Sequence, residues 1–304
     1  MDTNTLLEEI SRLKKEKDAI ILAHYYTDDL VQQAADYVGD SYYLSKIGKE
    51  AKEQTILFCG VKFMGESAKI LSPHKQVVMA DELADCPMAH MVDPEKIKEM
   101  REAYEDLAVV CYINSTAEIK ALADVCVTSS NAIDIVKNLS EKNIYFIPDE
   151  HLGRYVAAHV PEKNVILNDG FCHVHTSIKK ENILKAKETL PKAKIVVHPE
   201  CTEDVVELGD YVGSTSGIID YVRGCEEESF IVCTEMGILY ELKKQNPTKK
   251  FYSVGHRQFC PNMKRISLEK MYEALRILEP QIHLNEELRQ KAKGALESMH
   301  LLAR

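Results

Sequence analysis

The chain contains the stretch Asn164-Val165-Ile166-Leu167-Asn168-Asp169-Gly170-Phe171-Cys172-His173-Val174-His175, in which an apolar, strand-like run leads into a glycine-containing loop with a cysteine. The same arrangement occurs twice more, where residues 76–80 lead to Cys86 and residues 250–255 lead to Cys260. The three cysteines are 86 and 88 residues apart. A repeated interval of this kind indicates three copies of one structural unit, each with a thiol at the same place.

The composition is that of an ordinary globular protein and excludes several kinds of partner. A chain of 304 residues, 45% of them hydrophobic, is long enough for two or three modest domains. A net charge of −10 without a basic stripe argues against a nucleic-acid partner. The acidic N-terminus does not resemble a signal peptide, and no apolar run approaches the roughly 18 to 20 residues of a membrane helix. We therefore expect a cytoplasmic protein with no membrane partner, whose nine cysteines are thiols or metal ligands rather than disulfides.

A pair of polar or aromatic residues follows the first strand-like run of each copy. The runs are residues 19–23, 107–111 and 195–197, and equivalent members of the pairs are again 88 and 86 residues apart. We predict a short helix after each pair, capped by Thr27, Ser115 or Thr202, with Ser115 and Glu118 forming a capping box. The pairs are His24 with Tyr26, Tyr112 with Asn114, and His198 with Glu200.

A second strand with its own signature follows in each copy, at residues 35–41, 123–129 and 209–215. It ends in a hydroxyl residue, Ser41, Ser129 or Thr215, where the next helix begins. Helix N-termini bind carboxylates and phosphates through their free N–H groups. Ordinary helix capping is the alternative interpretation of these hydroxyls.

The pattern of each copy, a strand followed by a helix four times over, predicts the fold. Strands that alternate with helices form parallel sheets covered on both faces. We predict an α/β protein with three pseudo-threefold-related α/β/α domains and an active site at their shared centre, because ligands bind at the carboxyl ends of parallel strands. The predicted domains are residues 1–86 with the C-terminal helices 264–304, residues 87–172, and residues 173–263.

Three thiolates on three loops are able to hold either zinc or an iron–sulfur cluster. Zinc usually takes closely spaced pairs of cysteines, and the sequence has no Cys-x-x-Cys pair. A [4Fe–4S] cluster held by three cysteines keeps one iron without a protein ligand, able to act as a Lewis acid. The shared period favours a metal-binding role for Cys86, Cys172 and Cys260 over burial as small apolar residues. The five that we interpret as buried are Cys59, Cys111, Cys126, Cys225 and Cys233, while Cys201 remains ambiguous.

His198 and Glu200 form the pair with the clearest chemistry. A histidine and a carboxylate at a strand end are suited to general acid–base catalysis. A structural histidine beside a helix cap is the alternative for these two residues, as interface packing is for Tyr26, Tyr112 and Asn114.

Taken together, these motifs resemble the quinolinate synthase family, the iron–sulfur enzymes of de novo NAD synthesis, over nearly the full length. Several motifs in the expected order make the resemblance far more specific than any one of them. The motifs are Ala23-His24-Tyr25-Tyr26, Gly39-Asp40-Ser41, Asp85-Cys86-Pro87-Met88-Ala89, Val110-Cys111-Tyr112-Ile113-Asn114-Ser115, Gly170-Phe171-Cys172-His173-Val174-His175, His198-Pro199-Glu200-Cys201, Gly213-Ser214-Thr215-Ser216-Gly217 and Phe259-Cys260-Pro261-Asn262-Met263.

The resemblance implies a transferase that condenses iminoaspartate with dihydroxyacetone phosphate and releases phosphate and water to give quinolinate. It implies a [4Fe–4S] cluster on Cys86, Cys172 and Cys260, with one iron not ligated by cysteine. It also allows a transient partner, an L-aspartate oxidase or dehydrogenase that supplies iminoaspartate. The implied catalytic residues are Glu200, His198, Tyr26 and His24. The implied substrate-binding residues are His24, Ser41, Tyr112, Ile113, Asn114, Ser129, His175, His198, Glu200, Ser214 and Thr215.

The sequence departs from the family pattern at two points. His90 stands where we expect an aspartate, and a second Cys-x-x-Cys pair found near the third cysteine in some members is absent. Two rival functions remain open at this stage. One is another cluster-dependent dehydratase with an open iron, and the other is a non-catalytic iron–sulfur or zinc sensor, which would give no role to His24, Tyr112, His198 and Glu200.

Overall fold

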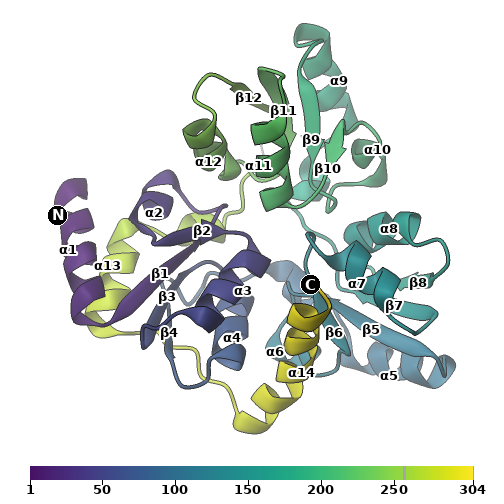
Figure 1. Ribbon diagram of the computed structural model, residues 1–304, viewed down its shortest axis with the longest axis horizontal. Coiled ribbons are helices and arrows are strands. Elements are labelled where there is room, and N and C mark those ends of the chain that lie inside the picture. Colours follow the sequence, from purple (N-terminus) through teal and green to yellow (C-terminus); the bar gives the residue numbers. More distant parts are fainter. Residues whose placement is uncertain (256–257, 304) are drawn as a thin grey trace. The chain divides into compact units, whose positions relative to one another are not determined.

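The structure is a computed structural model that describes residues 1–255 and 258–303 (Figure 1). Contacts between Cα atoms group the chain into two compact units. Unit 1 comprises Met1–His90, Ile113–Cys126 and Pro261–Arg304, and unit 2 comprises Met91–Tyr112 and Val127–Cys260. The division into three domains at residues 86 and 172 stays a prediction.

The predicted α/β architecture is confirmed, since the strands form three four-stranded parallel sheets, one for each copy (Figure 1). The strand orders are β2-β1-β3-β4, β6-β5-β7-β8 and β10-β9-β11-β12. The strands are β1 (Ala19–His24), β2 (Tyr37–Gly39), β3 (Thr55–Cys59), β4 (Gln76–Met79), β5 (Leu107–Tyr112), β6 (Val125–Val127), β7 (Asn143–Ile147), β8 (Asn164–Leu167), β9 (Lys194–Val197), β10 (Tyr211–Val212), β11 (Ser229–Cys233) and β12 (Lys250–Ser253).

The first and third strands of each sheet are apolar runs because both of their faces are covered. Every residue of β1, β3 and β5 is buried. In the first sheet Ala19 pairs with Thr55 and Ala23 with Cys59, so β1 and β3 run side by side in register. Parallel strands that carry helices on both faces have this continuous apolar character.

In unit 1, two groups of helices cover opposite faces of the first sheet (Figure 1). Helices α1, α2 and α13 contact one another and strands β1, β3 and β4, whereas α3 and α4 contact each other and the other face. The C-terminal helix α14 and the short α6 pack on α4. The helices of this unit are α1 (Thr3–Glu16), α2 (Asp29–Ala34), α3 (Ser41–Glu50), α4 (Lys62–Leu71), η1 (Pro87–His90), α6 (Ala117–Lys120), η3 (Met263–Arg265), α13 (Leu268–Ile277) and α14 (Glu286–Leu302).

In unit 2, the third sheet has one apolar core in which Ile183, Ile195, Val205 and Ile231 pack together. This core joins α9 and α10 to β9 and β11, while α11 and α12 contact each other and the edge strands. The helices are α5 (Pro94–Ala103), α7 (Ala132–Asn138), α8 (Glu150–His159), η2 (His175–Ser177), α9 (Lys180–Thr189), α10 (Glu203–Val206), α11 (Thr215–Gly224) and α12 (Ile238–Gln245).

Two of the predicted helix caps are wrong by one residue. Asp28 rather than Thr27 is the N-cap of α2, and Thr116 rather than Ser115 caps α6 by accepting the N–H of Ile119 at 3.4 Å. Because Ser115 is not the cap, the predicted capping box with Glu118 does not form. Thr202 occupies the predicted N-cap position of α10, but its hydroxyl makes no capping hydrogen bond.

The strand order places a switch point between the first and third strands of every sheet. From the first strand the chain crosses to one side, and from the third strand it crosses to the other, so the loops after these two strands diverge and leave a crevice. His24 and Tyr112 are the last residues of β1 and β5, and His198 directly follows β9. The three predicted pairs therefore stand at the switch points of their sheets.

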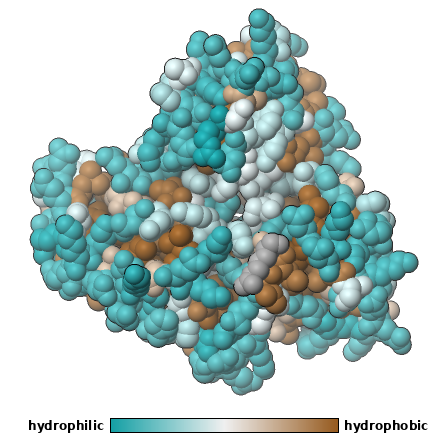
Figure 2. Space-filling model, viewed as in Figure 1, coloured by the Kyte–Doolittle hydropathy of each residue, from teal (hydrophilic) through white to brown (hydrophobic). Residues whose placement is uncertain are grey.

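No helix in the described part of the chain is long and apolar enough to cross a membrane. On the face drawn in Figure 2, hydrophilic side chains cover most of the surface, and apolar side chains show between them as separate areas.

Candidate active site

The candidate active site of unit 2 centres on the buried carboxylate of Glu200, which is 3% exposed. Its Oε2 atom lies 2.6 Å from Nδ1 of His175 and 3.7 Å from Nδ1 of His198. The two imidazole rings stack, with centroids 4.6 Å apart and planes 23° apart. Two histidines from different loops therefore converge on one carboxylate.

His198 is oriented by the turn that follows β9. Its Nδ1 accepts the backbone N–H of Glu200 at 3.3 Å, and its carbonyl accepts that of Cys201. A neutral His198 then carries its proton on Nε2, which lies 3.2 Å from Oγ of Ser129. The structure thus brings the predicted residues Ser129, His198 and Glu200 together.

The same turn recurs in unit 1 after β1. Nδ1 of His24 accepts the backbone N–H of Tyr26 at 3.1 Å, and the His24 carbonyl accepts that of Thr27. The Tyr26 ring packs edge-on against His24, with centroids 4.5 Å apart. The sequence spacing that paired His24 with Tyr26 and His198 with Glu200 therefore reflects one repeated local structure.

His175 joins the carboxylate to the cysteine loop. It lies in η2, three residues after Cys172, and its Nδ1 is 3.2 Å from the Cys172 sulfur. On the other side of the ring, Nε2 is 2.9 Å from Oγ1 of Thr234. Cys172, His175 and Glu200 also have the side-chain types that bind metal ions, and their donor atoms lie within 4.8 Å of one another. No other such group of three occurs among the described residues.

Glu200 is held in its charged form, and the nearby carboxyl group of Asp149 has the opposite shift in pKa. Burial alone would raise the pKa of Glu200, but the charges of His175 and His198 and the side chain of Tyr112 hold it well below its usual value. Burial raises the pKa of Asp149 well above its usual value, and the charge of Glu200 raises it further. Two neighbouring carboxyl groups with opposite shifts are typical of a site that handles protons.

The remaining predicted residues of unit 2 are Tyr112, Ser214 and Thr215, and all three are buried. Tyr112 ends β5 and favours the charged form of Glu200. Ser214 is the N-cap of α11, where its Oγ accepts the N–H of Gly217 at 3.1 Å, and Thr215 is the first residue of that helix. Capping thus accounts for Ser214.

Unit 1 holds the other predicted residues, which are His24, Tyr26, Ser41, Ile113 and Asn114. Ser41 begins α3, but the cap is Asp40, which accepts the N–H of Tyr43. Asn114 has a buried Oδ1 with no hydrogen-bond partner in the part of the chain that the structure describes. An orphaned buried oxygen is costly unless a ligand supplies the donor.

Burial separates the cysteines into two groups. Cys86, Cys172 and Cys260 are only partly buried, as is Cys225. The other five are buried, and burial raises the pKa of Cys233 to about 12. Those five are Cys59, Cys111, Cys126, Cys201 and Cys233, of which Cys201 was left open by the sequence. Cys225, predicted to be buried, is the exception, and its thiol donates to Glu227 at 2.7 Å.

Three buried polar residues of unit 2 were missed by sequence reasoning: Asp149, Thr234 and Glu235. All three are fully buried and directly follow the third strand of a sheet. Asp149 and Glu235 are equivalent in the repeat, but the first copy has Val61 at this position, so no polar pattern recurs three times. The signal that was available is a charged residue at a strand end in two of the three copies.

Comparison with known proteins bears on this geometry over nearly the whole chain. A family model described as "Quinolinate synthetase A protein" matches residues 8–301. Relatives named quinolinate synthase include one from Clostridioides difficile strain 630, 50% identical over 298 residues, covering 98% of each chain. One from Fusobacterium nucleatum is 52% identical over 296 residues, covering 97% of this chain and 99% of the relative.

The chain belongs to the quinolinate synthetase A protein family. The predicted resemblance to this family is therefore confirmed.

The three cysteines predicted to bind a cluster share one structural setting, which fits that role. Each follows the fourth strand of its sheet and precedes a short 3₁₀ helix, η1, η2 or η3. Partial exposure on a loop leaves a thiolate able to bind metal, unlike a thiol sealed in a core.

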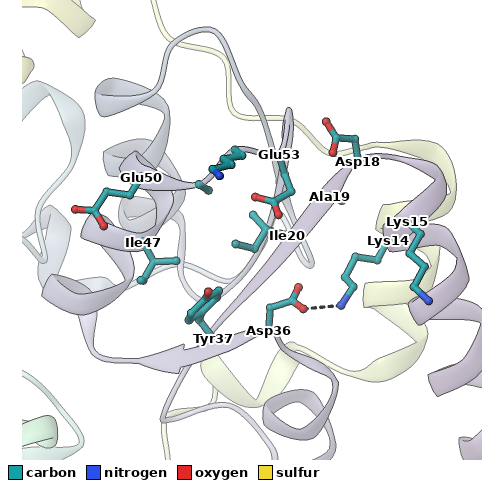
Figure 3. Close-up of a pocket in the computed structure, with 12 residues that line it drawn as sticks. Lys14, Lys15, Asp18, Ala19, Ile20, Asp36, Tyr37, Ile47, Glu50 and Glu53 are labelled. Carbon is teal, nitrogen blue, oxygen red and sulfur yellow. Dashed lines mark hydrogen bonds and ion pairs between the residues drawn. The ribbon is translucent and has the colours of Figure 1, made fainter.

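A cavity of about 620 Å³ in unit 1 lies elsewhere (Figure 3). Lys14, Asp18, Ala19 and Asp36 line it at the amino end of β1, and an ion pair joins Lys14 to Asp36. His24 stands at the opposite end of the same strand. The cavity is therefore not the candidate active site of this quinolinate synthetase A family member.

Proposed function

We propose that this protein is a quinolinate synthase, which condenses iminoaspartate with dihydroxyacetone phosphate and releases phosphate and water. The observation that carries the proposal is the buried Glu200 carboxylate between His175 and His198, in a chain about half identical to relatives named quinolinate synthase. A role in NAD synthesis, in the cytoplasm, is part of the proposal.

Cys86, Cys172 and Cys260 would hold the [4Fe–4S] cluster. When bound, a cluster with three cysteine ligands supplies one open iron, a Lewis acid toward a carboxylate or hydroxyl oxygen. Their common place after the fourth strand and their partial exposure support this assignment.

Glu200 is the proposed general base. The condensation requires removal of a proton next to a carbonyl, and Glu200 is held in the charged form that accepts one. His198 carries a proton on Nε2 beside Ser129 and, as a neutral imidazole, is positioned to donate a hydrogen bond to an oxygen of the substrate. His175 pairs directly with the carboxylate through Nδ1, so it stabilises the negative charge that Glu200 carries before it accepts the proton. Tyr26 and His24 complete the proposed catalytic set.

The substrate iminoaspartate carries two carboxylates, and hydroxyl, amide and helix N-terminal groups suit them. The buried, unpartnered Oδ1 of Asn114 and the hydroxyl of Ser129 beside His198 support a polar ligand at these positions. The proposed binding residues are His24, Ser41, Tyr112, Ile113, Asn114, Ser129, His175, His198, Glu200, Ser214 and Thr215. An L-aspartate oxidase or dehydrogenase is the proposed transient partner that supplies iminoaspartate.

The test is an assay on protein purified without oxygen. Iron and acid-labile sulfide are measured first, and quinolinate and phosphate are then measured after addition of both substrates. Equal amounts of quinolinate and phosphate support the proposal. A protein that holds a cluster and yields no quinolinate is instead another cluster-dependent enzyme, and a protein with zinc in place of iron and sulfide favours the sensor.

A further inference from the structure

One backbone hydrogen bond recurs at all three cysteine loops. In each copy, the residue three positions after the end of the third strand donates its backbone N–H. The acceptor is the carbonyl of the residue two positions before the cysteine. Gly170 shows how closely these segments approach, since a Cβ atom there would lie 2.6 Å from the carbonyl oxygen of Pro148. The bonds are Lys62 to Ala84 at 2.8 Å, Glu150 to Gly170 at 2.8 Å, and Met236 to Gln258 at 2.7 Å.

At two of these loops, a carboxylate also accepts the backbone N–H of the cysteine itself. The N–H of Cys86 donates to Oδ1 of Asp85 at 2.7 Å, and that of Cys260 donates to Oε1 of Glu235 at 3.0 Å. At the second loop the backbone N–H of Cys172 favours the charged form of the nearby Asp149, but Oδ1 of Asp149 accepts the N–H of Leu152 and its Oδ2 has no hydrogen-bond partner among the described residues. The first copy takes its carboxylate from the preceding residue because Val61 stands where Asp149 and Glu235 stand in the others.

The two buried carboxyl groups, those of Glu235 and Asp149, each accept a backbone N–H from a residue shortly after them in the chain. Oε2 of Glu235 accepts the N–H of Gly237 at 2.6 Å, and Oδ1 of Asp149 accepts that of Leu152 at 2.7 Å. Both residues are fully buried at the start of a helix, so their side chains cannot turn away from the cysteine loops. Both oxygens of Glu235 accept N–H groups, an arrangement that favours the carboxylate over the protonated acid.

We propose that Asp85 and Glu235 are positioning residues for two of the cluster cysteines, anchoring the backbone N–H groups of Cys86 and Cys260. The inference rests on the proposed function, because it takes the three cysteines as cluster ligands. Two effects follow from the geometry. The anchored N–H groups hold the thiolates in place. Because these N–H groups donate to carboxylates, they do not donate to the cluster sulfurs. Hydrogen bonds to the sulfurs and loss of negative charge would each raise the reduction potential of the cluster. These carboxylates therefore retain the cluster and keep its potential low.

The test transfers the carboxylate of one copy to the place it has in another. Glu235→Val removes the acceptor for Cys260 and introduces the residue that the first copy has at Val61. Adding Phe259→Asp then puts a carboxylate directly before Cys260, as Asp85 precedes Cys86, at a side chain that is 44% exposed. Glu226→Val, at an exposed loop position before β11, removes the same charge as a control. All variants are reconstituted with iron and sulfide without oxygen.

Three quantities are measured: thermal unfolding of the apoprotein, the rate of iron release to a chelator, and the reduction potential of the cluster. We expect Glu235→Val to release iron about 10- to 100-fold faster, the usual effect of losing a partner of a metal ligand. We expect its potential to rise, and Phe259→Asp to reverse both changes. Asp85→Ala, on a partly exposed loop, gives the same test at Cys86 should Glu235→Val not fold.

The outcomes separate this inference from the proposed function. Unchanged iron release and potential in Glu235→Val or Asp85→Ala, in protein that holds a cluster, overturn the inference alone. A lower unfolding temperature as the sole change also overturns it, since Glu235 would then serve only the fold. Wild-type protein that takes up no iron and sulfide overturns the proposed cofactor and the inference with it.

Discussion

Nδ1 of His175 lies 2.6 Å from Oε2 of Glu200, although helix α9 and strand β9 separate the two residues in the sequence. His175 follows the cysteine of the second copy, whereas Glu200 follows the first strand of the third copy. The same Nδ1 is 3.2 Å from the sulfur of Cys172. One imidazole therefore links a proposed cluster ligand to the proposed general base. Changes at the ring are expected to reduce catalysis more than they reduce the stability of the fold.

The first prediction concerns Glu200 itself. Glu200→Gln keeps the size of the side chain but cannot accept a proton. We expect turnover to fall by about 100- to 10,000-fold, the usual value of a general base. Iron and sulfide content and the affinity for substrate should stay near those of the wild type. Near-normal quinolinate formation would reassign the base, and His198 is the next candidate.

The second prediction concerns Thr234, whose Oγ1 lies 2.9 Å from Nε2 of His175. Thr234→Val keeps the shape of the side chain but leaves a buried imidazole nitrogen without this partner, a loss of about 1 to 3 kcal/mol. If that energy orients His175 for catalysis, kcat falls by about 5- to 150-fold while cluster content is unchanged. Thr234→Ser retains the hydroxyl and should keep kcat. Equal kcat in the valine and serine variants would mean that Thr234 does not position His175.

Much of the fold was predictable because parallel strands covered on both faces are apolar throughout. The runs at β1, β5 and β9 stood out for this reason, and the period of the copies placed His24 and His198 in equivalent turns. Asp36 and Asp210, which occupy equivalent positions beside the second strands of the first and third copies, were less informative about function, because both stabilise the fold. Their carboxylates accept the N–H of Ile21 and Ile195 in the neighbouring strand.

The rest was not predictable from local pattern. Glu235 accepts the N–H of a cysteine 25 residues later, and Asp149 lies near one 23 residues later, through a pairing that only the sheet brings about. Val61 interrupts the series, so a search for residues common to three copies passes over them. Helix caps also depend on the backbone path, and a hydroxyl one residue early, such as Thr27, instead donates to the carbonyl of His24 at 2.8 Å.

The third prediction concerns Asp81, which ties the end of the first sheet to the C-terminal segment in unit 1. Lys270 lies 2.6 Å and Arg265 lies 3.2 Å from its Oδ2. Burial alone would raise the pKa of Asp81, but the hydrogen bonds from Lys270 and Leu83 and the charges of Lys270 and Arg265 hold it below its usual value. A carboxyl with a lowered pKa contributes stability above its unfolded pKa, about 3.9, and loses it as the pH falls through the folded pKa.

Asp81→Asn should therefore lower the free energy of unfolding by about 1.5 to 3 kcal/mol near neutral pH. The difference from the wild type should shrink as the pH falls below about 4, because the wild-type carboxyl is then protonated. Urea unfolding of both proteins across this range measures it. Asp220→Asn is the control, since its pair with Arg223 is exposed and should contribute about 0 to 1 kcal/mol. A difference that is constant with pH would contradict the assignment.

The last prediction compares two glycines that both lie inside helices of unit 1. A Cβ atom on Gly65, in α4, would stand 2.3 Å from Sδ of Met79 and 3.2 Å from Cγ1 of Ile282, both buried. Gly65→Ala should therefore destabilise the protein by about 1 to 3 kcal/mol through overpacking, despite the better helix propensity of alanine. A Cβ on Gly294, in α14, meets no atom within 4 Å, so Gly294→Ala should stabilise it by about 1 kcal/mol. Opposite shifts in unfolding temperature are expected, and a rise in both would show that Met79 moves aside at little cost and that α4 does not need its glycine to approach the sheet.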